Sequence, residues 1–116
     1  MFSPTSSHRF FLFSEPTDMR KSFNGLCGLV QSRMGRNPVS GEVFVFIGTH
    51  KNAIKLLHWE EGGFVLYYKR LEKGTFAYPK EPFERNTYPI SWPSLVLLVE
   101  GITALKHYQK PRYKAS

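Results

Sequence analysis

The sequence predicts one α+β domain, an antiparallel β-meander sheet of about four to five strands packed with two helices. Three observations support this fold class. Short apolar runs separated by polar or glycine-containing turns follow one another between residues 42 and 72, as in strands joined by hairpins. An apolar repeat with helical spacing precedes these runs, and another follows them. The chain has 116 residues, 41% of them hydrophobic, which suits a single hydrophobic core.

A short aromatic strand is predicted at "HRFFLF" (8–13), followed by the first helix. Thr17 or Asp18 is the expected N-cap, and Gly35 is the expected end. Gly25 and Gly28 inside this helix allow a strand, a partner or a nucleic-acid backbone to press close, and tight packing on the protein's own sheet is the favoured explanation. The helical spacing rests on five apolar residues: Met19, Phe23, Leu26, Val30 and Met34.

The meander begins with "EVFVFIG" (42–48), which is almost wholly apolar and should be covered on both faces. Strands are then predicted at 53–60 and 64–72, with the glycines of "EGG" giving a tight turn between them. A short fourth strand is predicted at 74–79. These connections are all short, so each strand should lie beside the next.

A second helix is predicted after the proline-rich loop "KEPFERNTYP", with Ser91 as N-cap and Pro93 in its first turn. The first helix should cover one face of the sheet, and either the second helix or a second subunit should cover the other. The domain is expected to span 1–103, followed by a basic flexible tail at 104–116. The apolar stripe of this second helix comprises Trp92, Leu95, Val96, Val99 and Ile102.

The charge balance favours a polyanionic partner. Sixteen Lys and Arg against nine Asp and Glu give a net charge of +7, and cations on a protein displace the counterions that surround nucleic-acid phosphates. No acid follows Glu100. The tail could order on a phosphate backbone or remain a solvated terminus. Its basic residues are Lys106, Lys110, Arg112 and Lys114.

The strand at 64–72 ends in a basic cluster. Lys69, Arg70 and Lys73 should gather at one rim of the sheet, level with Lys51 in the preceding turn of the meander. Phosphate contact is the favoured interpretation, although basic residues at a sheet edge also discourage aggregation. Tyr67 and Tyr68 are expected to fill the core rather than to face nucleic acid, and so are Trp59 and Trp92.

The sequence offers little for catalysis or metal binding. Its one aspartate, Asp18, is explained as a helix cap, and adjacent Glu60 and Glu61 would point to opposite faces of a strand. Four scattered histidines and the single cysteine, Cys27, do not form a zinc motif. We therefore predict no catalytic residue, no metal and no cofactor. One cysteine, no signal peptide and no long apolar run favour the cytoplasm and exclude a membrane partner.

Four blocks, "PTDMRKSFNGLCGLV", "GEVFVFIG", "IKLLHWEEGGFVLYYKRLEKGTF" and "ISWPSLVLLVEGI", resemble the TnpB or Orf2-like accessory proteins of IS66-type insertion sequences. The resemblance runs from about Arg9 to Ile102. It departs from the family pattern in the turn "GTHKNAI", which is usually richer in arginine. It also departs at Glu61-Gly62-Gly63, where the family often has an Asp-Gly type turn. The family's motifs fall on Asp18–Lys21, Lys55–Leu57, Tyr68–Leu71, Gly74 and Phe76, and none of these is an established catalytic residue.

The resemblance implies a non-enzymatic bacterial accessory factor that assists a separate transposase during transposition. We expect it to bind DNA, either non-specifically or at the element ends, through backbone phosphates. The alternative is an adaptor that dimerises and binds the transposase without contacting DNA, using the strand at 43–47 and the second helix as surfaces. A cryptic enzyme using Asp18 and Glu60 is a weaker third hypothesis. The expected DNA contacts are Arg20, Lys21, Lys51, Lys55, Lys69, Arg70, Lys73 and the four basic residues of the tail.

Overall fold

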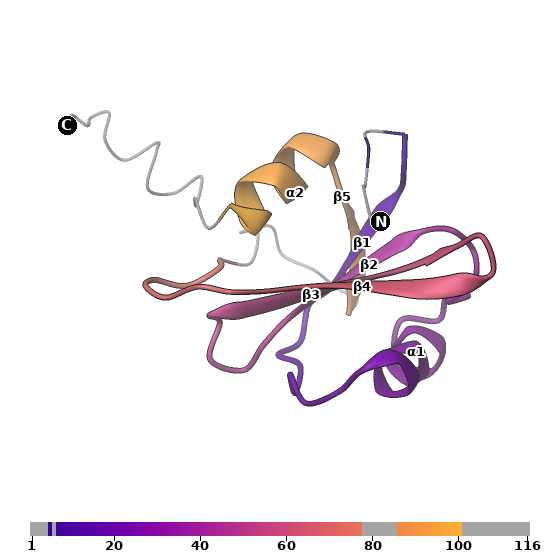
Figure 1. The fold of residues 1–116 in the computed structure, drawn as a ribbon, viewed down its shortest axis with the longest axis horizontal. Coiled ribbons are helices and arrows are strands. Elements are labelled where there is room, and N and C mark those ends of the chain that lie inside the picture. The colour runs from indigo at the N-terminus through magenta and orange to yellow at the C-terminus, as the bar shows by residue number, and fades with distance from the viewer. Residues whose placement is uncertain (1–4, 6, 78–85, 101–116) are drawn as a thin grey trace.

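The chain forms a five-stranded sheet with one helix on each face (Figure 1). The computed structural model describes residues 5, 7–77 and 86–100. The α+β class is therefore confirmed, with the first helix on one face and the second on the other. In chain order the elements are β1 (Phe10–Phe13), α1 (Phe23–Ser32), β2 (Val43–Ile47), β3 (Ala53–Glu60), β4 (Gly63–Arg70), β5 (Thr87–Ile90) and α2 (Trp92–Val99).

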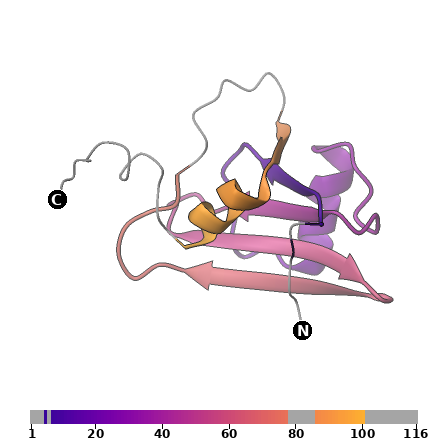
Figure 2. The same ribbon diagram turned by 90° about the horizontal axis from the view of Figure 1, so that it is seen from above.

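The sheet has the order β4-β3-β2-β1-β5, which Figure 2 shows from the α2 side. Strands β2, β3 and β4 form the predicted antiparallel meander. Strand β1 instead lies parallel to β2, and α1 is the crossover that such a parallel pair needs. The β3–β4 turn places Glu61 (φ 48°) and Gly62 (φ 84°) in the left-handed region, as a two-residue hairpin of the primed type requires.

The strand predicted at 74–79 is absent from the described residues, and the fifth strand of the sheet comes from a later segment. Residues 74–77 form no strand, and Phe76 is buried with its N–H donating to the Lys51 carbonyl at 2.6 Å. Residues 78 and 79 lie outside the described part. Strand β5 instead comes from Thr87–Ile90, which the proline content marked as loop, and it pairs antiparallel with β1. Pro89 is tolerated because β5 is an edge strand.

Helix α1 begins later than predicted. Its N-cap is Ser22, not Thr17 or Asp18. Thr17 belongs to the sheet instead: its N–H donates to the Ile47 carbonyl at 2.9 Å, which extends the parallel pairing beyond β2. Gly48 is needed at this point, because a Cβ there would lie 2.7 Å from Met19 Cγ. Gly35, with φ of 66°, follows the helix end as expected.

The close packing on the protein's own sheet that was favoured for the two glycines of α1 is wrong. A Cβ at Gly28 would meet nothing within 4 Å, and one at Gly25 would meet only the side chain of Lys21. No backbone presses on the described part of the helix at these points. Phe23 is also exposed rather than part of the buried stripe.

Two apolar layers hold the sheet between the helices. Strand β2 is completely buried because both of its faces are covered, so it offers no surface to a partner, contrary to the alternative in which it formed an interface. The α1 layer consists of Phe11, Phe13, Leu26, Val30, Met34, Phe44, Phe46 and Leu57. The α2 layer consists of Phe10, Leu12, Val43, Val45, Ile47, Ile54, Leu56, Phe76, Leu95 and Leu98.

Helix α2 is capped as predicted, with the Ser94 N–H donating to the Ser91 hydroxyl at 3.2 Å. Leu95 and Leu98 are its buried residues, whereas Val96, placed in the apolar stripe by the sequence, is 36% exposed. Ile102 lies outside the described residues.

Neither tryptophan is fully buried, although both were expected in the core. Trp92 packs at the margin of the α2 layer, with its ring 5.7 Å from that of Phe10. Trp59 lies edge-on to Phe64 at 4.9 Å.

Candidate nucleic-acid interface

The structure brings three exposed basic residues of the meander to one end of the β3–β4 hairpin: Lys51, Arg70 and Lys73. Ala53 is paired with Arg70, and the Leu71 N–H donates to the Asn52 carbonyl at 2.8 Å. The turn before β3 and the segment after β4 therefore run side by side. This juxtaposition agrees with the meander prediction, and phosphate contact by these residues stays a prediction.

Lys69 does not join this group. Side chains alternate along β4, so Lys69 points to the α2 side and Arg70 to the α1 side. The Lys69 ammonium donates to the carbonyl of Val99 at 2.8 Å, at the negative end of α2. Its position is explained by capping this helix, which corrects its assignment to the basic rim.

Lys55 is also removed from the candidate contacts. The residue is only 5% exposed, and its ammonium donates to the carbonyls of Met19 at 2.8 Å and Lys21 at 2.7 Å. Burial lowers its pKa from the ordinary lysine value. These two bonds also explain the late start of α1, because the carbonyls of its predicted first turn bind lysine instead. Lys55 therefore holds the segment before α1 against β3.

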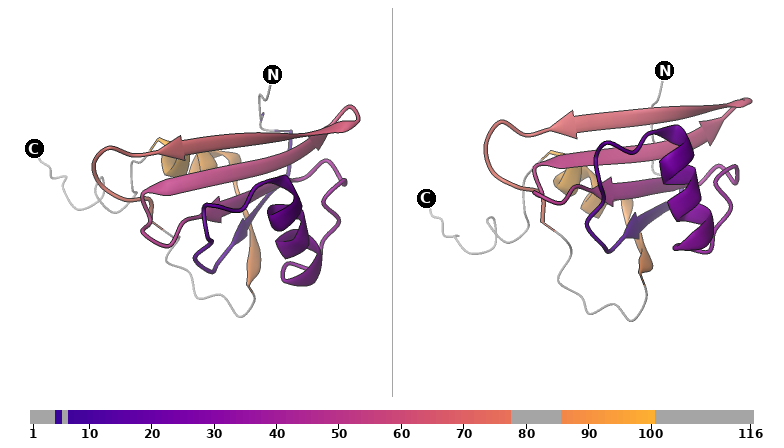
Figure 3. Two further views of the ribbon diagram at one scale, coloured as in Figure 1. Left: turned by 60° about the horizontal axis from the view of Figure 1, so that its bottom comes forward. Right: turned by 90° about the horizontal axis from the view of Figure 1, so that it is seen from below.

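Arg20 and Lys21 lie on the segment that Lys55 anchors, which crosses the sheet on its way to α1 (Figure 3). Both are exposed. The Arg20 guanidinium binds the Asp18 carboxylate at 2.7 Å and holds the pKa of Asp18 well below its usual range. The stem of Lys21 lies against Gly25, where a Cβ would be 3.1 Å from the lysine.

Tyr68 is exposed, contrary to the core position expected for it. It is paired with Lys55 across the hairpin, and its ring centroid lies 4.7 Å from the Lys55 ammonium, a cation–π distance. Tyr68 as a whole residue is 51% exposed, whereas Tyr67 points to the other face and packs against the α2 layer. The alternation of side chains correctly placed the two tyrosines on opposite faces of the sheet. It did not show that the α2 side is covered at this point and the α1 side is open.

We define the hairpin surface as the exposed residues on the α1 side of the β3–β4 hairpin and of the adjoining segment before α1. Arg70 belongs to it because it follows Tyr68 by two positions and therefore shares its face. The segment before α1 joins it through the bond from Lys55 to the Lys21 carbonyl. Its members are Arg20, Lys21, Tyr68 and Arg70.

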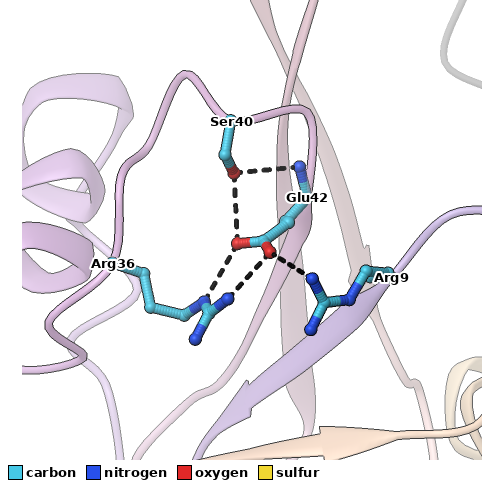
Figure 4. Close-up of polar contacts among 4 residues, drawn as sticks. All are labelled: Arg9, Arg36, Ser40 and Glu42. Carbon is cyan, nitrogen blue, oxygen red and sulfur yellow. Dashed lines mark hydrogen bonds and ion pairs between the residues drawn. The ribbon is translucent and has the colours of Figure 1, made fainter.

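A second basic cluster, not predicted from the sequence, lies between β1 and the loop before β2 (Figure 4). Glu42 accepts two bonds from Arg36, at 2.8 and 2.9 Å, and lies 3.3 Å from Arg9. Ser40 donates to the same carboxylate at 3.1 Å. Chiefly through Arg36, these partners lower the pKa of Glu42. Both guanidiniums also lie over the Phe11 ring, Arg36 at 3.9 Å.

This second cluster, which we call the Glu42 cluster, is balanced by its carboxylate and packed on a core ring. Nothing in the local sequence signals it, because Arg9 and Glu42 meet only through the β1–β2 pairing.

The titratable residues that the structure describes show no metal-binding arrangement. Within 7–77 and 86–100, no three His, Cys, Asp or Glu side chains gather closely enough to hold an ion. His58 is buried against the ring of His8, 4.8 Å away, and burial lowers its pKa. Burial likewise raises the pKa of the Cys27 thiol.

No helix in the part of the chain that the structure describes is long and apolar enough to cross a membrane. The basic residues of the tail, Lys106, Lys110, Arg112 and Lys114, lie outside the described residues.

Comparison with known proteins gives a family match and two relatives. The model of the family described as "IS66 Orf2 like protein" matches residues 8–109. The chain is 31% identical to the uncharacterised protein y4jC of Sinorhizobium fredii (strain NBRC 101917 / NGR234) over 111 residues, covering 96% of this chain and 93% of the relative. It is 36% identical to the uncharacterised protein y4hO of the same strain over 95 residues, covering 81% and 80%. No solved structure matches the chain.

Proposed function

The chain belongs to the IS66 Orf2-like family, a family associated with transposition, and from this membership we propose that it assists transposition by binding DNA through backbone phosphates. The observation that carries the proposal is the gathering of exposed cations from three chain segments around the β3–β4 hairpin. Arg20 and Lys21 come from the segment before α1, Lys51 from the turn before β3, and Arg70 and Lys73 from the end of β4 and beyond.

The distribution of acids supports this location. The Glu42 cluster pairs its arginines with a carboxylate, whereas among the described residues of the hairpin surface only Arg20 forms an ion pair, with Asp18. Lys21 and Arg70 are exposed and have no ion-pair partner among the described residues. Exposed cations that are not held in an ion pair are the ones able to release counterions from DNA.

In this proposal the protein carries out no chemistry of its own, and strand cleavage and joining belong to the separate transposase. Metal-dependent strand transfer needs several carboxylates around its ions. Asp18, one candidate for a cryptic activity, is bound by the guanidinium and the backbone N–H of Arg20. Asp18→Asn and Glu60→Gln variants that retain transposition would agree with this assignment, and loss of transposition with intact DNA binding would oppose it.

The test is a mobility-shift titration on element-end and scrambled duplexes at several salt concentrations. If the five exposed cations each neutralise one phosphate, log affinity against log salt should have a slope of about −4.5. Arg70→Gln should make the slope shallower by about 1, whereas Arg33→Gln, which removes a charge paired with Glu15, should leave it unchanged. Absence of binding at low salt, or a flat salt dependence, would refute the proposal.

A second candidate is the adaptor that binds the transposase without touching DNA. One observation favours it: α2 is built almost entirely of apolar residues, and Val96 is exposed on it. Co-purification of the two proteins that survives nuclease and high salt, and that Val96→Ser abolishes, would support the adaptor. If the same helix forms a homodimer, analytical ultracentrifugation without the transposase should show a dimer for the wild-type protein and not for Val96→Ser.

A further inference from the structure

We propose that the hairpin surface binds single-stranded nucleic acid, with the ring of Tyr68 stacking on an unpaired base and Arg70 and Lys21 contacting the flanking phosphates. This inference rests on the proposed DNA binding and names the form of DNA that the surface takes. It starts from the 51% exposure of Tyr68, a large aromatic residue among exposed cations.

The ring is held in a defined place. The Lys55 ammonium lies 4.7 Å from the ring centroid and is itself fixed by two carbonyls, at 2.7 and 2.8 Å. An ammonium so anchored cannot follow the ring, so the ring is restrained over it. A restrained aromatic side chain loses less conformational entropy when a ligand stacks on it.

The position of Tyr68 leaves room for a ligand. Strand β4 is an edge strand of the sheet, with β3 as its single neighbour among the described strands. A nucleic-acid chain can therefore approach the ring from the open side of β4.

The flanking charges suit a polynucleotide backbone. Arg70 follows Tyr68 on the same face, about 7 Å further along the strand. Lys21 comes from another segment, and its carbonyl binds the same Lys55 ammonium that lies against the ring. A stacking ring with cations supplied from two segments is the combination by which proteins bind single strands without sequence preference.

An intact duplex does not fit this arrangement equally well. In a duplex both faces of each base are stacked on neighbouring bases, so Tyr68 could reach only the phosphates and groove edges. A single strand, or a frayed end, exposes base faces to the ring. Tyr68 should therefore distinguish the two forms, while Arg70 should contribute to both.

The test measures fluorescence anisotropy of the full-length protein with a labelled oligothymidine of about 20 nucleotides and with a duplex of the same length. The variants are Tyr68→Leu, which removes the ring, and Tyr68→Phe, which keeps it. We expect Tyr68→Leu to weaken single-strand binding about 5- to 100-fold and duplex binding by less than about 2-fold, with Tyr68→Phe close to wild type. Arg70→Gln should weaken both, and Arg33→Gln should weaken neither.

Several outcomes would overturn the inference. Equal losses on both forms, or no loss on the single strand, would show that Tyr68 does not stack, while salt-dependent duplex binding would leave the proposed function standing. Binding to neither form would refute both. If Tyr68→Leu fails to fold, the NMR shifts of the Tyr68 ring protons in the wild type decide the question. They should move upfield on adding oligothymidine, and unchanged shifts would contradict stacking. If the protein bound neither oligonucleotide but bound the transposase in a way that Tyr68→Leu abolished, the hairpin surface would be a protein interface.

Discussion

The hairpin surface and the Glu42 cluster contain similar side chains but use them differently. Each contains at least two cations and an aromatic ring, and each ring lies within cation–π distance of a lysine or arginine. In the Glu42 cluster the ring, Phe11, is buried, and Arg9 and Arg36 share one carboxylate. On the hairpin surface the ring, Tyr68, is exposed, and the one cation near it that is buried, Lys55, binds backbone carbonyls.

The difference shows why counting charges cannot locate a binding site. A cation whose partners are supplied by the fold contributes to stability, whereas a cation left at the surface is available to a ligand. Lys55 and Lys69 are in the first category although the sequence placed both among the expected DNA contacts. Predictions that separate stability from binding therefore test the comparison directly.

The largest effect is expected for Lys55→Met. Methionine keeps the apolar stem but leaves the carbonyls of Met19 and Lys21 without their donor. We expect the free energy of unfolding to fall by about 2–4 kcal/mol, measured by urea denaturation. A fall of less than about 0.5 kcal/mol would mean that Lys55 is no anchor. The matched control, Lys51→Met, removes an exposed lysine from the turn just before β3 and should cost far less.

The next largest effect is expected for Glu42→Gln. The substitution removes the charge that Arg9 and Arg36 share and should lower the free energy of unfolding by about 1–3 kcal/mol at neutral pH. Glu15→Gln serves as control, because the Glu15 and Arg33 side chains are 41% and 47% exposed and solvent-exposed pairs contribute about 0–1 kcal/mol. Equal effects of the two substitutions would contradict the distinct role of the Glu42 cluster.

The pH dependence of the same comparison has a definite sign. The folded-state pKa of Glu42 lies below its ordinary value of 4.5, chiefly because of the bond from Arg36. The stabilisation is therefore fully present above pH 4.5 and is lost as the pH falls through the folded pKa. The stability difference between wild type and Glu42→Gln should shrink over this range in denaturation curves. If the difference in stability stayed constant with pH, the charge of Glu42 would not be the source of the stabilisation.

The smallest effect is expected for removing hairpin-surface side chains. Arg70→Gln and Tyr68→Phe should change the free energy of unfolding by no more than about 0.5 kcal/mol, because both side chains are exposed. Thermal denaturation is sufficient to measure this. A loss above about 1 kcal/mol would move the hairpin surface into the same structural category as the Glu42 cluster.

The sequence predicted the meander and both helices because their signals are local. Alternation, turn glycines and the Ser91 cap act within a few residues, and β3 begins and ends where the pattern placed it. Strand β5 was missed because its pairing with distant β1 outweighs the loop signal of its proline.

The site was only partly predictable for the same physical reason. The meander correctly placed the Lys51 turn beside the end of β4. Lys55 and Lys69 are not available to DNA because their ammonium groups bind carbonyls 30 to 36 residues away in the chain. No local sequence pattern encodes these contacts. On the same face of β4, Phe64 and Leu66 pack against the α1 layer whereas Tyr68 is exposed, and spacing alone does not show where that cover stops.

The central claim is that available cations lie on the hairpin surface and not in the paired clusters. The most direct test compares two double variants of equal net charge, Lys21→Gln/Arg70→Gln and Arg9→Gln/Arg33→Gln, in duplex binding at several salt concentrations. The first pair should make the slope of log affinity against log salt shallower by about 2, and the second should leave it at the wild-type value. Equal losses in the two variants would contradict the account, because binding would then follow total charge alone.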